Sequence, residues 1–440
     1  MLNTLPGMKS RPSDKLRAAG DSGRTVVNMK KLIIKILCLT LCTITAISLL
    51  NGCSGKLPPI AGNHSYEKDK ISTETVNGNT GFAFDIFKQL DKEDGNQNIF
   101  ISPLSISTAL TMTYQGAGTT TKEAMAKALG YSGIDDGKLN ESYKNLLRYL
   151  KQLDKKVELN ISNSLWIKEG ETIKEKFISA NRDIFDASVT SMDFSKDNAA
   201  NEINQWISNA TKKKIEKMID PPISPDIIMF LINAIYFKGD WKEKFDTKNT
   251  ISAPFHAGDG STDEVKMMSR YGKVEYGQGD GFKAVRLPYG SGKAAMYCIL
   301  PDESTSVGDF IAGMDNDRWT AVKDSISEKN DVRLQLPRFK LEYGIKNLNG
   351  SLTAMGMGEA FTDPADFSGI RDNLCISRVL HKAVIEVNEE GSEAAAVTVV
   401  EVRETAAAEP LTFIADRPFV FLIADDVTGS ILFIGKVYSI

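Results

Sequence analysis

Apolar residues follow a helical spacing in the first half of the chain. Phe82, Ile86 and Leu90 lie four residues apart within an apolar cluster, which predicts an amphipathic helix over residues 82–90. Pro103 stands just inside a helix start, and Thr120 and Glu123 have the spacing of a capping box. Further helices are therefore predicted from Pro103 onward and over 120–129, 141–153 and 200–207.

Strand-like runs become frequent in the second half. Alternating or continuous apolar residues predict strands over 98–101, 157–161, 164–167, 227–232, 282–287 and 294–299. A single later helix is predicted where Leu348, Leu352 and Gly356 are spaced by four. Helices thus gather early and strands late, without regular alternation, which predicts an α+β class.

One segment near the C-terminus is unusual. Read as a strand of period two, one of its faces has no charge and no proline, and consists of Ser392, Ala394, Ala396, Thr398, Val400 and Val402. The other face carries the charges, Glu393, Glu401 and Arg403 among them. An ordinary antiparallel strand is one interpretation. The small alanine side chains at its start and the alanine- and proline-containing end argue against that interpretation, because they would anchor a sheet poorly.

Composition and charge narrow the class of function. The 440 residues are 42% hydrophobic and 25% charged, which is typical of a globular protein with a large core. The first 52 residues hold eight basic and two acidic residues, so the remainder has 45 basic and 55 acidic ones. This excess of acidic residues argues against a nucleic-acid partner. Only three histidines occur, and catalytic and phosphate-loop motifs are missing. Neither an enzyme, nor a cofactor, nor a metal site is expected.

The N-terminus has the order of a secretory leader. Basic residues at 30–31, an apolar stretch over 36–50 and a small-residue end predict a signal peptide within 1–52, with Met29 as the true start. Cys53 ends a sequence similar to a bacterial lipobox, so its lipidation and a membrane anchor are expected; an uncleaved anchor helix is the alternative. Residues 53–78 are predicted to be a flexible tether and 79–440 the folded domain, anchored or secreted outside the cytoplasm. Cys298 is expected to be buried in a strand, and its pairing with Cys375 stays open.

From about Gly81 to Ile440 the chain resembles the serpin family, in the form of a bacterial lipoprotein-type member. The matching stretches are NIFISPLSI at 98–106, LINAIYFKGDW at 231–241, LPRF at 336–339, ADFSGI at 365–370, HKA at 381–383, EEGSEAAA at 389–396 and FIADRPF at 413–419.

The resemblance implies three β-sheets, eight or nine helices and an exposed reactive-centre loop. A serine protease, or sometimes a cysteine protease, cleaves the loop and becomes covalently attached. The loop then inserts into the central sheet and distorts the enzyme before it can be released. A monomer is expected. A non-inhibitory serpin that acts as a carrier or chaperone is the alternative.

The family's functional positions carry over onto this sequence. The loop hinge corresponds to Glu389, Glu390, Gly391, Ser392, Glu393, Ala394, Ala395, Ala396 and Thr398. The resemblance also implies that Ser102, Ser105, Asn233 and His381 lie together where the strands part, and that Trp241 lies where insertion begins.

The bond that the protease cuts is predicted between Thr405 and Ala406. This follows from the usual distance between hinge and cut, while counting back from residues 417–419 favours Ala407 and leaves Ala408 open. These side chains are small and favour elastase-like or subtilisin-like proteases. Arg403 is the alternative for a trypsin-like enzyme.

Overall fold

Nine α-helices lie within residues 65–392 and 410–440, the part of the chain that this computed structural model describes. They are α2 (Thr73–Glu93), α3 (Pro103–Tyr114), α4 (Thr119–Ala128), α5 (Asp136–Leu150), α6 (Glu175–Phe185), α7 (Ala199–Ala210), α8 (Val307–Ala312), α9 (Asn316–Ser325) and α10 (Asn349–Leu352). Shorter helical turns are η1 (Lys68–Lys70), η2 (Thr247–Asn249), η3 (Thr353–Met357) and η4 (Gly358–Phe361).

The strands form one large sheet and three smaller hydrogen-bonded sets. The large sheet contains β1 (Ile99–Ile101), β17 (Ile431–Val437), β16 (Phe419–Asp425), β8 (Ala294–Pro301), β7 (Phe282–Tyr289), β6 (Thr262–Gly279), β9 (Ser327–Pro337) and β15 (Leu411–Ile414), with β5 (Ile251–His256) beside β6. The second set is β14 (Gly391–Ser392), β4 (Met229–Asp240), β2 (Val157–Lys168) and β3 (Ser188–Met192). Two pairs remain, β10 (Phe339–Glu342) with β13 (Val384–Val387) and β11 (Lys346–Asn347) with β12 (Leu380–His381).

The first long helix begins earlier than the sequence predicted. Ser72 caps α2 by accepting a hydrogen bond from the backbone N–H of Thr75. The first turns bury Thr75, Val76, Asn79 and Thr80, and the preceding backbone N–H of Ser72 donates to the Ser142 hydroxyl on α5. The prediction of a tether up to residue 78 is therefore wrong for its last part. Most of the residues that the helix buries there are polar, so the sequence shows no apolar periodicity in that part.

The late part of the chain contains more helix than predicted. Helices α8 and α9 are short, and the side chains of Ser306 and Asp315 cap them. Conversely, the two strands predicted over 157–161 and 164–167 are one strand, β2, which pairs with β4 without interruption through the buried polar residue Asn163.

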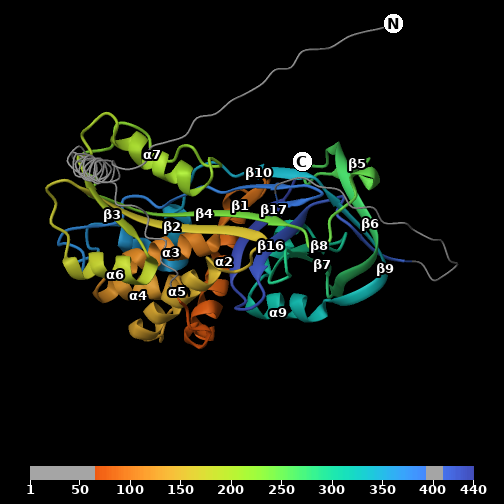
Figure 1. Ribbon diagram of the computed structural model, residues 1–440, viewed down its shortest axis with the longest axis horizontal. Helices are drawn as coiled ribbons and strands as arrows, with labels where there is room; N and C mark the ends of the chain where they lie inside the picture. Colours follow the sequence, from red (N-terminus) through yellow and green to blue (C-terminus); the bar gives the residue numbers. More distant parts are fainter. Residues whose placement is uncertain (1–64, 393–409) are drawn as a thin grey trace, which may run out of the picture. The chain divides into compact units, whose positions relative to one another are not determined.

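Two long strands carry the functional region. In Figure 1, β2 and β4 run side by side across the view, with α3 and α5 below them and α7 at the upper left. Successive residues of β4 face opposite sides. Leu231 and Ile235 pack with the main core, whereas Phe230 and Ile232 pack with α7 and the segment after it.

A seam separates β4 from β13. One edge of β4 pairs with β2 from Met229 to Gly239, whereas the only strand pairing of its other edge among the described residues is that of Gly239 and Asp240 with β14. Strand β13 pairs with β10 on the side away from the seam. The described strands thus form four hydrogen-bonded sets, where three sheets were expected, and the seam lies between the set that contains β4 and the pair β10–β13. Among the residues described, no helix is long and apolar enough to cross a membrane.

Candidate functional site: hinge and seam

The hinge begins where β13 turns back into β14. Gly391 lies opposite Asp240, and Ser392 lies opposite Gly239. Gly391 has a φ of 143°, and a Cβ atom there would lie 2.1 Å from the carbonyl oxygen of Gly239. Only glycine fits this backbone conformation and this close approach. The first step of a new strand on the free edge of β4 is therefore already in place.

Ser392 points into the protein and contacts an aromatic pair. Its side chain is buried, and its hydroxyl oxygen lies 2.9 Å from that of Tyr289. The Tyr289 ring stacks on the indole of Trp241 at 4.5 Å between centroids. Trp241 donates from its indole nitrogen to the carbonyl of Asn388 and from its backbone nitrogen to that of Glu390. Trp241 thus holds both sides of the turn that precedes Ser392.

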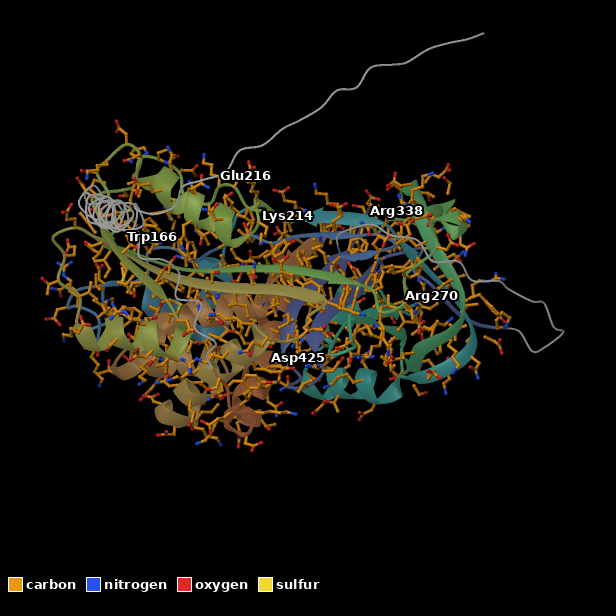
Figure 2. The ribbon with its side chains drawn as sticks, in the orientation of Figure 1. Trp166, Lys214, Glu216, Arg270, Arg338 and Asp425 are labelled. Atoms are coloured by element: carbon orange, nitrogen blue, oxygen red, sulfur yellow. The ribbon has the colours of Figure 1, made fainter. Side chains whose placement is uncertain are left out.

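Two acidic side chains fasten the same turn. The side chain of Glu389 is only 4% exposed, and it accepts hydrogen bonds from Arg338 and Thr250. Burial opposes ionisation of Glu389, but these hydrogen bonds outweigh it, so the pKa of Glu389 is lowered. Glu390 forms an ion pair with Lys244 at 2.5 Å. Figure 2 shows Arg338 and Arg270 near this end of the long strands, while Trp166 lies near the other end.

The serines, the asparagine and the histidine that the resemblance singled out lie beside the seam. The backbone N–H of Ser102 donates to Nε2 of His381 at 3.1 Å, and the Ser102 hydroxyl donates to the carbonyl of Leu432. The Ser105 hydroxyl donates to the carbonyl of Asn233 on β4 at 3.4 Å. These contacts connect α3 to both edges of the seam.

Ser102, Ser105, Asn233 and His381, here the polar cluster, do not satisfy all of their hydrogen-bonding atoms. The side-chain amide of Asn233 donates to Oδ1 of Asn163 at 2.6 Å, whereas Oδ1 of Asn233 is buried and has no partner in the described part of the chain. Burial lowers the pKa of His381 to about 4, so its ring is neutral at pH 7. Because Nε2 accepts from Ser102, the ring proton is on Nδ1.

Two cavities lie along the seam. A cavity of about 790 Å³ lies between residues 229–235 of β4 and residues 370–382. A second cavity, of about 180 Å³, lies between residues 235–237 of β4 and β13. Asn233 and His381 line the larger cavity, and Ser392 lines the smaller one. The free edges of the strands therefore enclose unfilled space.

Several predicted residues lie outside the described residues. They are Cys53 and, within 393–409, Glu393, Ala394, Ala395, Ala396, Thr398, Arg403, Thr405, Ala406, Ala407 and Ala408. The two later cysteines are described. Cys298 is buried and Cys375 is exposed, and both thiols are free, so the two do not pair in this structure.

Five contact residues of the hinge and the cluster were not identified from the sequence. Tyr289, Asn163, Arg338, Thr250 and Lys244 each touch a predicted residue from a distant part of the chain. Arg338 stands within the LPRF stretch that carried the resemblance. The other four had no signal in the sequence, since strand register decides which residues meet.

Comparison with known protein families identifies the family to which the chain belongs. The family model for serpins, serine protease inhibitors, matches residues 77–440. The chain belongs to the serpin family. The predicted α+β class and serpin fold are thereby confirmed.

Individual serpins resemble the chain over most of its length. The leukocyte elastase inhibitor of Bos taurus is 33% identical over 376 residues, which are 82% of this chain and 98% of that protein. The native-state structure of the thermophilic serpin tengpin matches with a TM-score of 0.76 and 32% identity, covering 86% of this chain and 96% of tengpin. Human thyroxine-binding globulin complexed with its hormone matches with a TM-score of 0.75 and 31% identity, covering 84% and 99%.

The matching serpins include archaeal and animal proteins. These relatives give no support to the expectation of a bacterial lipoprotein type.

Proposed function

We propose that this serpin is a suicide inhibitor of serine proteases, and that its cleaved loop fills the seam between β4 and β13. The observation that carries the proposal is the pairing of Gly391 and Ser392 with the end of a strand edge that pairs with no other strand among the described residues. A free edge next to the start of a long uncharged face favours strand addition.

The chemistry of the covalent step is that of acyl transfer. The protease serine attacks the carbonyl carbon of the residue before the cut and forms an ester. The peptide bond breaks, and the amine of the next residue leaves with the proton. Insertion then competes with hydrolysis of the ester by water. A loop that enters the sheet quickly carries the protease away before hydrolysis.

The pairings at the turn before Ser392 support a register for the inserted strand. If the strand continues from Ser392 opposite Gly239, Thr398 would lie opposite Asn233. If it continues from the bridge between Asn388 and Gly391, Thr398 would lie opposite His381 on the other edge. Thr398 would thus enter between the two residues of the polar cluster that flank the seam, and its hydroxyl could donate to the unpartnered Oδ1 of Asn233.

The same register supports inward burial of the uncharged face. Ser392 is inward and buried, so in an inserted strand Ala394, Ala396, Val400 and Val402 would also point toward the core. Val402 would reach the level of Met229, where β4 begins. A cut between Thr405 and Ala406 lies three residues further. All paired positions would then lie before the bond that the protease breaks.

The target class follows from the small residues around that bond. Thr405, Ala406, Ala407 and Ala408 suit the shallow apolar pockets of elastase-like and subtilisin-like proteases. A leukocyte elastase inhibitor among the similar proteins supports this choice.

The experiment combines two measurements on the purified protein. Incubation with elastase and with subtilisin should give a covalent complex that survives SDS, and nicking the loop with a catalytic amount of protease should raise the melting temperature. A carrier, as the likeness to thyroxine-binding globulin would favour, should give cleavage without a complex and no rise in melting temperature.

We further propose that the leader directs the chain out of the cytoplasm and that Cys53 is lipidated, which rests on residues 30–53 alone. Metabolic labelling with a palmitate analogue should mark the wild type and not Cys53→Ala. Equal labelling of both would exclude Cys53 as the acceptor.

A further inference from the structure

The larger cavity, here the seam cavity, is lined by apolar and polar residues from four parts of the chain. Strand β4 and residues 370–382 flank it, α3 lies on the core side, and the segment after α7 lies on the other face. Figure 2 shows Lys214 and Glu216 of that segment above β4. Representative apolar lining residues are Leu110, Ile207, Ile219, Leu231, Ile376 and Leu380. Its volume of about 790 Å³ lies within the range of about 300–1,000 Å³ found for small-molecule sites.

Basic residues predominate among the charged groups that line this cavity. Arg371, Arg378 and Lys382 line it, against the single carboxylate of Asp226. Arg371 pairs with Glu171 and Lys382 with Glu342. Arg378 is exposed, and within the described ranges no carboxylate forms an ion pair with it; Asp220 influences it electrostatically but is itself bound to Lys217.

We propose that the seam cavity binds an apolar molecule with one carboxylate, of about the size of a medium-chain fatty acid, and that this ligand delays loop insertion. The apolar walls would bury the chain of the ligand, and Arg378 would hold the carboxylate. Partly exposed Leu374, Ile376 and Val379 show that the walls are incompletely covered. The regulatory half of this inference rests on the proposed inhibitory function.

Ligand and loop compete for the same space. In the register proposed above, Val400 would lie opposite Leu231 and Val402 opposite Met229, and both of these β4 residues line the seam cavity. A bound ligand must therefore leave before Val400 and Val402 can enter the sheet. Slower insertion gives water more time to hydrolyse the ester. With ligand bound, a larger fraction of the protein is therefore cleaved as a substrate and a smaller fraction traps the protease.

The test uses dodecanoate below its critical micelle concentration and isothermal titration calorimetry on the full protein. Uncleaved protein should bind, and Arg378→Ala should weaken binding about two- to fivefold, as expected for loss of an exposed charge interaction. The control Arg182→Ala, on the exposed face of α6, should bind like the wild type. Ala109→Phe, which projects into the cavity from α3, should reduce binding further. Dodecanoate should also raise the number of inhibitor molecules consumed per protease molecule.

Several outcomes would overturn the inference. They are no binding to the uncleaved protein, equal affinity for wild type and Arg378→Ala, and equal binding to cleaved protein whose melting temperature has risen. A cleaved protein with an unchanged melting temperature would instead refute loop insertion, while dodecanoate binding that is sensitive to Arg378→Ala would still establish the ligand site. The two proposals can therefore fail separately.

Discussion

The hydroxyl of Ser392 lies 2.9 Å from the hydroxyl of Tyr289, beneath the end of β4. This contact fixes which way the hinge faces, because a strand that starts with Ser392 inward must place every second residue inward as well. Ala394 would come opposite Phe237, whose ring touches Tyr289 and Phe433 in the core. Ala395 would face the outside.

The first prediction uses this alternation. Ala394→Arg should slow insertion at least about tenfold, because a buried unpaired charge costs more than the 1.4 kcal/mol that equals a factor of ten. The protein should then be cleaved as a substrate. The matched control Ala395→Arg should still inhibit, since its side chain stays outside. The measurement is the stoichiometry of inhibition of both variants. Equal behaviour of the two would contradict the period-two interpretation.

The sequence could predict the hinge but not the surroundings that give it direction. The EEGSEAAA stretch is local, so the position of Gly391 and the uncharged face were accessible from the sequence. Tyr289 is 103 residues away from Ser392, and nothing in its own neighbourhood marks it. Such pairs depend on the register of several strands, which is set by the whole core.

The start of the folded domain shows a second limit. Thr75, Asn79 and Thr80 are buried on α2 although they are polar, so a search for apolar periodicity began the helix too late. Asn79 accepts hydrogen bonds from Tyr131 and Tyr143, which lie on other elements. Burial of polar residues through distant partners leaves no hydrophobic pattern to find.

A second prediction concerns the contact expected between Thr398 and Asn233 after the cleaved loop has inserted. Thr398→Val keeps the shape of the side chain but removes the hydroxyl that would satisfy Oδ1 of Asn233. Cleaved Thr398→Val should be less stable than cleaved wild type by about 1 kcal/mol, the usual worth of one hydrogen bond. Uncleaved protein should be unaffected, and Thr398→Ser should behave like the wild type. Thermal melts before and after cleavage measure this. A loss that is equal in both forms would place Thr398 elsewhere.

A third prediction is a pH dependence caused by His381. Its pKa is about 4 in the folded protein and about 6.5 when unfolded, so the unfolded state binds the proton first as the pH falls. Stability is fully present above pH 6.5 and is lost toward pH 4, by about 3 kcal/mol for this group. His381→Gln should lose that much less over the same range. Urea denaturation of both proteins at pH 7 and pH 4 gives the difference. Identical losses would show that His381 takes up its proton without cost.

The final prediction is the position of the cut. Counting from Glu389 gives Thr405 as the last residue of the inserted part, whereas counting back from residues 417–419 points nearer to Ala407. The hinge count is preferable, because the length before the cut decides how far the protease is carried, while extra residues after it only lengthen a loop at small entropic cost. Cleavage after Arg403 would shorten the inserted part by two residues and leave Glu404 beside the bond, so it should release the protease more often than it traps it. Mass spectrometry of the C-terminal fragment from the elastase complex should show Ala406 as its first residue. A fragment that begins outside residues 406–409, together with full inhibition, would refute this position.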